Sequence, residues 1–151
     1  MVFQIDSDDE MSHIYFEAFW NNRQKYSALF GNRIGRQQNI GRSIISKVSR
    51  VAVRLFFGRG VTDVNVPYRL MRSSVLSKIV GKIPSDTFAP NILISGVISV
   101  SGLPILNVPV PHESRKSGAS SIVKSRLWKA AVLSLVQTIR FGIRNICNNA
   151  R

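Results

Sequence analysis

The sequence predicts an α/β fold in one folding unit, with a mixed sheet, flanking helices and a C-terminal amphipathic helix. At 151 residues and 44% hydrophobic content, the chain is long enough for one domain with a core. Short apolar runs typical of strands alternate with segments of helical period. No internal repeat, low-complexity tract or Pro/Ser-rich linker divides it. We therefore expect one main domain, residues 1–121, and a terminal helix within 122–151.

The first part of the chain predicts strand, helix, strand and helix. A short buried strand is expected over residues 2–5 and a helix over 11–26. Residues 29–38 predict a strand end and an arginine-rich loop, because glycine and asparagine punctuate them. Residues 42–57 follow helical spacing. The apolar face of that helix is expected to hold Ile44, Val48, Val51 and Leu55, and its basic face Arg42, Ser46, Arg50 and Arg54.

The second part predicts further short elements. Residues 62–71 are expected to be a strand or extended loop, and 73–80 a short helix that ends before a glycine. Residues 92–100 fit helix or strand, and we favour helix. A strand over 105–110 is expected to end at a proline, and a polar loop to follow over 112–121.

The terminal segment predicts a basic amphipathic helix. Its basic flank favours membrane contact over core packing, although periodicity alone fits both. No stretch offers the roughly 20 apolar residues that a spanning helix needs. The expected apolar stripe is Trp128, Val132, Leu135, Ile139, Ile143 and Ile146, beside Lys124, Arg126, Arg140 and Arg144.

Charge points to an anionic partner. The chain has 21 Lys and Arg against 8 Asp and Glu, a formal charge of +13. Phosphate, nucleic acid and an acidic membrane all suit this balance. The lone Cys147 excludes an internal disulfide. Half of the acids lie between Asp6 and Glu10, so one local acidic site faces a basic remainder.

This acidic cluster follows the first expected strand. Ligands of open α/β sheets bind at the carboxyl ends of strands. Asp6 and Asp8 can share a hard divalent cation, Mg²⁺ or Mn²⁺, which proteins hold with one or two carboxylates plus substrate phosphates. The alternative is a solvated acidic turn or a helix N-cap. Neither His13 nor His112 has a second histidine or cysteine at metal-binding spacing, so we expect neither to be a metal ligand.

Several segments, taken in order, resemble family 2 glycosyltransferases, particularly dolichol-phosphate mannosyltransferase and the bacterial polyprenyl-phosphate glycosyltransferases. No single motif is decisive, and their order and spacing carry the resemblance up to about residue 121. The matching segments are Val2-Phe3-Gln4-Ile5-Asp6-Ser7-Asp8, Gly31-Asn32-Arg33, Arg42-Ser43-Ile44-Ile45-Ser46, Asp63-Val64-Asn65-Val66-Pro67-Tyr68-Arg69-Leu70 and Val108-Pro109-Val110-Pro111-His112-Glu113-Ser114-Arg115-Lys116-Ser117-Gly118-Ala119-Ser120-Ser121.

The resemblance implies the C-terminal part of a GT-A (Rossmann-like) domain, a nucleotide-sugar donor and a polyprenyl-phosphate, other lipid or glycan acceptor. It implies that Asp63 is the catalytic base, and that the protein is cytoplasmic or peripheral on the inner face of the membrane. The implied donor diphosphate and metal residues are Asp6, Asp8 and Glu10, the last standing where the family often has Gln. The implied acceptor-phosphate residues are Arg33, Arg42, Ser46 and Arg115.

The resemblance also implies a missing part, because this family carries a nucleotide-binding half ahead of the Asp-x-Asp motif. We therefore expect a truncated or split gene product that is inactive alone. A noncatalytic glycosyltransferase remnant is one alternative. A basic nucleic-acid-binding module is another, favoured by a pI of about 11.1 and disfavoured by the lack of an aromatic-rich recognition motif. We expect no nucleic-acid partner.

Overall fold

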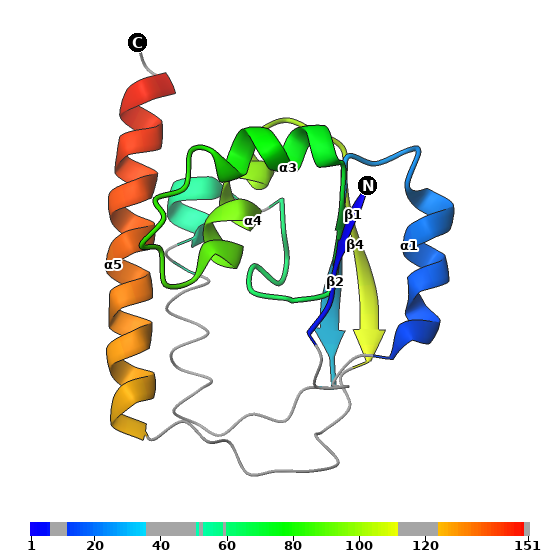
Figure 1. Ribbon diagram of the computed structural model, residues 1–151, viewed down its shortest axis with the longest axis horizontal. Coiled ribbons are helices and arrows are strands. Elements are labelled where there is room, and N and C mark those ends of the chain that lie inside the picture. Colours follow the sequence, from blue (N-terminus) through cyan, green and yellow to red (C-terminus); the bar gives the residue numbers. More distant parts are fainter. Residues whose placement is uncertain (7–11, 36–50, 52, 59, 112–123, 150–151) are drawn as a thin grey trace.

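The computed structural model describes residues 1–6, 12–35, 51, 53–58, 60–111 and 124–149. Apart from the long terminal helix, its helices and strands are short (Figure 1). They are β1 (Val2–Gln4), the 3-10 turn η1 (His13–Tyr15), α1 (Phe16–Asn22), β2 (Ala28–Ile34), β3 (Arg69–Met71), α3 (Ser73–Val80), α4 (Pro90–Val100), β4 (Ile105–Pro111) and α5 (Lys124–Asn149).

The four strands form one mixed sheet in the order β1-β3-β2-β4. β3 pairs antiparallel with both of its neighbours, whereas β2 and β4 are parallel. β1, β2 and β4 therefore run in one direction, and their last residues share one edge, which we call the carboxyl edge (Figure 1). This arrangement confirms the predicted α/β class with a mixed sheet and flanking helices.

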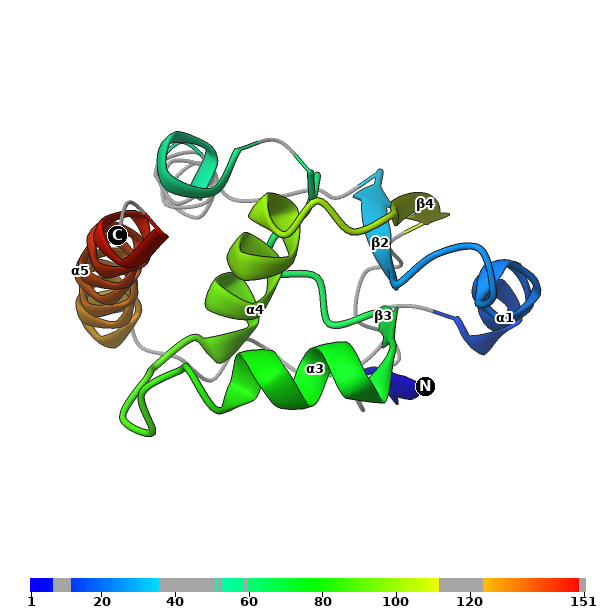
Figure 2. The same ribbon diagram turned by 90° about the horizontal axis from the view of Figure 1, so that it is seen from above.

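Helices cover both faces of the sheet (Figure 2). On one face, α1 packs through Phe19, whose ring lies 5.0 Å from that of Tyr68. Phe3 of β1 lies 5.0 Å from the same ring, also edge to face. On the other face, α4 buries Ile92, Leu93 and Ile98 among its apolar residues. Burial of these side chains is the main stabilising contribution to the fold.

Several predicted elements are confirmed, and two need correction. The predicted helix at 73–80, the helix at 92–100 and the strand at 105–110 match α3, α4 and β4 within a few residues. The helix predicted over 11–26 is shorter, with η1 leading into α1. The buried strand predicted over 2–5 is instead an edge strand, since β1 pairs only with β3 and Val2 is exposed.

The helix predicted over 42–57 is described only at residues 51 and 53–57, where it is helical. The predicted inward face is wrong there. Val51 and Leu55 are 56% and 77% exposed, whereas Val53 and Phe57 are buried. Both pairs have four-residue spacing, so periodicity supports either face. Phe57 faces inward because α4 has Gly96 opposite it, which leaves room for the ring.

We expect Gly96→Ala to lower the free energy of unfolding by about 1–3 kcal/mol, through overpacking. A Cβ atom at this position would lie 2.7 Å from Cγ of Phe57, which is fully buried and cannot withdraw. Urea denaturation followed by circular dichroism measures the change. Gly81→Ala is the matched control, because its added Cβ meets only Ser77 O at 3.7 Å. An unchanged Gly96→Ala protein would disprove the close contact.

The terminal helix α5 is helical as predicted, and it leaves part of the predicted apolar stripe exposed. Val132 and Ile143 of the predicted apolar stripe are exposed, whereas Ser134 and Thr138 are buried. Gly142 faces the core as well, since a Cβ there would lie 2.8 Å from Phe56. The cause is close packing, because small residues let the helix approach its neighbours. Within the described ranges, no helix combines the length and apolar character that a membrane-spanning segment needs.

Candidate active site

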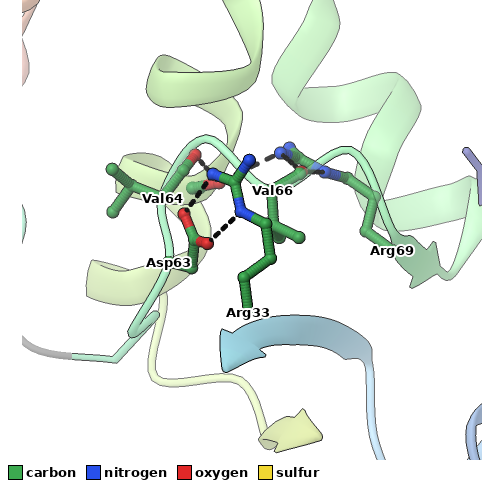
Figure 3. A network of polar contacts seen from close by, with 6 residues as sticks. Arg33, Asp63, Val64, Val66 and Arg69 are labelled. Atoms are coloured by element: carbon green, nitrogen blue, oxygen red, sulfur yellow. Dashed lines mark hydrogen bonds and ion pairs between the residues drawn. The ribbon is translucent and has the colours of Figure 1, made fainter. Parts of the chain in front are cut away.

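An arginine–aspartate pair lies at the carboxyl edge of the sheet. Arg33, the second-last residue of β2, donates from Nε to Oδ2 of Asp63 at 2.6 Å and from Nη2 to Oδ1 at 3.0 Å. Their side chains are only 10% and 17% exposed. Figure 3 shows the guanidinium facing the carboxylate across this edge. Two parallel bonds between planar charged groups fix both position and orientation.

Backbone anchors hold the loop that carries Asp63. Val61 N donates to Ser99 Oγ at 3.1 Å, and Thr62 N donates to Asn107 Oδ1 at 3.0 Å. Asn107 Nδ2 in turn donates to Gly60 O at 3.0 Å. The Asn107 side chain of β4 thus bonds the backbone on both sides of residue 61. The loop is positioned by α4 and β4 rather than by its own sequence.

The loop continues from Asp63 to β3 along α4. Ser95 Oγ donates to Val64 O at 2.8 Å, and Val66 N donates to Asp63 O at 3.2 Å. Ser95 is fully buried on the sheet-facing side of α4. A helix can bury a serine without cost only where its hydroxyl finds partners, and here Val64 O of the loop, Asn91 O of α4 and Nη1 of Arg69 are all within hydrogen-bond distance. Asp63 therefore lies in a constrained backbone segment.

Arg69 is a second arginine at this edge, and it is fully buried. Its Nε donates to Val66 O at 2.9 Å and its Nη1 to Asn91 O at 3.2 Å. Nη2 also bonds Val66 O. Burial lowers the pKa of Arg69 to about 10, against the opposing attraction of Asp63 and Asp6. The group is still a cation at neutral pH, and it joins the loop to α4.

No role for Arg69 was predicted from the sequence. A signal was present, because an arginine within a strand of apolar residues must either reach solvent or find buried partners. Its neighbours on both adjacent strands, Gln4 and Phe30, are opposite it in register. The Arg69 guanidinium lies 5.4 Å from the ring centre of Phe30, and Gln4 Nε2 donates to Asn91 Oδ1 at 3.2 Å.

Asp6 lies at the carboxyl end of β1, two residues beyond Gln4, and is exposed. An exposed carboxylate at a strand end fits one ligand position for a hard cation such as Mg²⁺. In the described part of the chain, no three His, Cys, Asp or Glu side chains come together as a ready metal site. The other predicted site residues lie outside the described residues: Asp8, Glu10, Arg42, Ser46 and Arg115.

The strands that precede these residues in the sequence end at the same edge of the sheet. β2 and β4 are parallel and both end at the carboxyl edge (Figure 1), and in the sequence Arg42 and Ser46 come after β2 and Arg115 after β4. The structure thus brings together Asp6, Arg33 and Asp63, three of the predicted residues, at one edge. It also shows a feature that the sequence did not predict, since Arg33 and Asp63 bond to each other.

A shallow groove of about 530 Å³ lies at the opposite edge of the sheet and is separate from this pair. It is formed where β3 ends, α3 begins and α1 ends. Both of its arginines already have partners: Arg23 lies 4.2 Å from the Trp20 ring, and Arg72 bonds Gln24 O at 2.9 Å. Its lining residues are Met1, Trp20, Arg23, Gln24, Arg72, Ser73 and Ser74.

Tyr68, next to Arg69, is fully buried, and its hydroxyl oxygen has no hydrogen-bond partner in the structure as described. Burial raises the pKa of this phenol. We expect Tyr68→Phe to raise the free energy of unfolding by about 1 kcal/mol, because an unpaired buried hydroxyl costs about 1–3 kcal/mol. Urea denaturation of this variant, with the partly buried Tyr15→Phe as control, measures the effect. A loss of stability would mean that the hydroxyl has a partner.

No family model matches the chain, and no curated protein or solved structure matches it either.

Proposed function

We propose that the carboxyl edge is the site of a metal-dependent glycosyltransferase, which moves a sugar from a nucleotide-sugar donor to a polyprenyl phosphate. The α/β sheet is then the corresponding part of a GT-A domain. The observation that supports this most is the Arg33–Asp63 pair beside Asp6, since phosphate-binding and acidic groups meet there. A phosphate acceptor and a metal-bound diphosphate need these two kinds of group side by side.

The donor half of the proposal rests on Asp6 and Asp8. Both are oxygen donors after β1, and together they would hold Mg²⁺ or Mn²⁺, with Glu10 beside them. Such a cation supplies positive charge that stabilises the departing diphosphate. The chain's own contribution is to fix the carboxylates at the end of a strand, so that the diphosphate lies against the edge.

The acceptor half rests on Arg33. A phosphate offers the same pair of oxygen acceptors as a carboxylate, and guanidinium binds either through two parallel bonds. We infer that an acceptor phosphate replaces Asp63 at the Arg33 fork. Arg42, Ser46 and Arg115 would then complete the phosphate contacts from the segments that leave the same edge.

The pairing also sharpens the role of Asp63. A hydroxyl acceptor needs a general base, whereas a phosphate acceptor is already ionised at neutral pH and needs orientation. An aspartate bonded through both oxygens to Arg33 is suited to orient that arginine. For a lipid-phosphate acceptor, Asp63 is therefore proposed to hold Arg33 in position until the phosphate replaces it, and for a hydroxyl acceptor to take the proton.

Two measurements on the purified chain test this function. Electron paramagnetic resonance measures Mn²⁺ binding in the presence of nucleoside diphosphates, and mass spectrometry measures sugar transfer from a panel of nucleotide sugars to farnesyl phosphate. The variant Asp6→Asn/Asp8→Asn is expected to weaken Mn²⁺ binding at least tenfold. Asp86→Asn is the matched control, because Asp86 is exposed and lies outside the carboxyl edge.

Transfer separates the enzyme from the alternatives. Metal-dependent binding with transfer supports the enzyme, and in a parallel assay with a hydroxyl acceptor Asp63→Asn should lower the rate about 10²–10⁴-fold. Binding without transfer fits both the noncatalytic remnant and a transferase part that is inactive alone. Mn²⁺ binding that is equal in Asp6→Asn/Asp8→Asn and in the wild type would disprove the metal assignment.

A further inference from the structure

The outward side of α5 is apolar where a solvated helix would be polar. Four of its apolar side chains are exposed over the described residues 132–144. Their exposed fractions are 56% for Val132, 47% for Leu133, 37% for Val136 and 50% for Ile143. Spacings of one, three, four and seven residues place them on one side of the helix. Core packing does not explain this side, because all four side chains are exposed.

The inward side of α5 is formed by small residues instead. Thr138 and Ser134 are 3% and 7% exposed, and Thr138 Oγ1 donates to Ser134 O at 2.7 Å. Gly142 lies against Phe56, and Phe141 stacks on Phe57 at 6.2 Å. These residues already provide the contacts of α5 with the core, and the Thr138 hydroxyl is hydrogen-bonded within the helix. The exposed apolar side chains are additional to the core.

Basic residues lie among these apolar side chains. Lys129, Arg140 and Arg144 are exposed, at spacings that place them on the same side as Leu133 and Val136. The sequence has no Asp or Glu after Glu113. We call the set of these three basic and the four apolar residues the α5 outer face. Long basic side chains can lie along an apolar surface while their charges reach outward.

The neighbouring helical residues 51 and 53–57 extend this character. They lie beside α5 (Figure 2), to which Phe56 and Phe57 connect them. Val51 and Leu55 are exposed there too, and Arg54 is exposed between them. Two helices that are adjacent in space thus both expose apolar and basic side chains and no acidic ones.

We propose that the α5 outer face docks in the plane of an anionic membrane surface. A bilayer rich in anionic lipids offers an apolar layer for Leu133, Val136 and Ile143, and negative headgroups for the basic residues. A second copy of the chain is less suited, because two such faces would oppose arginine to arginine without an acid between them. The proposal goes beyond sugar transfer, since it depends only on α5.

Vesicle flotation tests the docking without metal, nucleotide or sugar. Wild-type chain is mixed with vesicles of phosphatidylcholine alone or with 30% phosphatidylglycerol, in roughly 0.1 M salt. We expect binding to the anionic vesicles, and weaker binding at high salt. Leu133→Ser/Val136→Ser/Ile143→Ser should lose binding at least tenfold. Circular dichroism checks that this variant is folded, which is expected because the three side chains are exposed.

Charge is tested by a second set of variants. Lys129→Gln/Arg140→Gln/Arg144→Gln should lower the partition coefficient on the order of 100-fold, because each basic residue near an anionic surface contributes about fivefold. The control Lys25→Gln/Lys78→Gln/Lys82→Gln removes the same charge from exposed positions elsewhere. A second control, Ile14→Ser, removes an exposed apolar side chain from η1.

Two results would overturn the proposal. One is equal loss of vesicle binding in the α5 and control variants, which would indicate attraction by net charge alone. The other is absence of vesicle binding together with a dimer in analytical ultracentrifugation that the three serine substitutions dissociate, which would assign the α5 outer face to a second copy. Because the assay contains no donor, failure of the glycosyltransferase proposal would leave its result unchanged.

Discussion

Replacing Arg69 by methionine is expected to lower the free energy of unfolding by about 3 kcal/mol. The change leaves the carbonyl of Val66 buried without its donor, and such a group costs about 1–3 kcal/mol. Asn91 O loses a donor as well. Methionine relieves the desolvation of the charge, which limits the loss. Arg69→Lys is expected to be destabilising too, because a single ammonium cannot reproduce a planar fork that bonds two segments.

Urea denaturation at pH 7 measures this effect, with Arg72→Met as the matched control. Arg72 is exposed and three residues away, so its substitution should cost under about 1 kcal/mol. Equal stability of the two variants would contradict the assigned contacts of Arg69.

We choose pH 7 for this measurement because the pKa of Arg69 is lowered but stays well above 7. Burial lowers the folded-state pKa of Arg69 to about 10. The unfolded chain therefore binds the proton more tightly, and stability contributed by this group rises with pH between about 10 and the ordinary arginine pKa. At pH 7 the arginine is charged in both states, so the comparison measures contacts and not titration.

The Arg33–Asp63 pair is expected to show the largest coupling in the described chain. Arg33→Met and Asp63→Asn should each lower the free energy of unfolding by about 3 kcal/mol, because each leaves a largely buried partner without its counter-charge. The double variant should lose less than the sum of the single losses, with a coupling free energy of about 1.5–3 kcal/mol.

A double-mutant cycle by chemical denaturation measures this coupling. The exposed Arg54, substituted as Arg54→Met and combined with Asp63→Asn, is the matched control, and its effect should be additive. Additivity of Arg33→Met and Asp63→Asn within about 0.5 kcal/mol would show that the two bonds contribute nothing in solution.

The end of α3 could be predicted from a local signal, because a glycine follows it. Pro90 is a local signal that was not used: its fixed backbone angle suits the first turn of α4, whereas the predicted helix began at residue 92. The inward face of the 53–57 segment was wrong, and the buried residues of α5 were not predicted, for a shared reason. Gly96 and Gly142 receive Phe57 and Phe56 from distant parts of the chain. Helical periodicity describes one helix alone and does not identify the neighbour that fills a gap.

In the candidate site, too, some residues could be named from the sequence, whereas the contact between them depends on the fold. Asp6 could be chosen from the sequence because it is a carboxylate at the end of a predicted strand, whereas Arg33 and Asp63 were named only through the resemblance to family 2 glycosyltransferases. The bond between Arg33 and Asp63 could not be predicted, since it depends on Asn107 and Ser99 holding the intervening loop. The roles of Arg42, Ser46, Arg115, Asp8 and Glu10 stay predictions.

The central claim is that a lipid phosphate replaces Asp63 at the Arg33 guanidinium. Nuclear magnetic resonance can follow the Nε–H signal of Arg33, assigned with Arg33→Met, while farnesyl phosphate is added. Farnesol and inorganic phosphate are the matched controls for the chain and the phosphate. The account predicts a saturable shift of this signal, and of the Asp63 carboxyl carbon, with farnesyl phosphate and not with farnesol. Unchanged Arg33 and Asp63 signals at saturating farnesyl phosphate would contradict it.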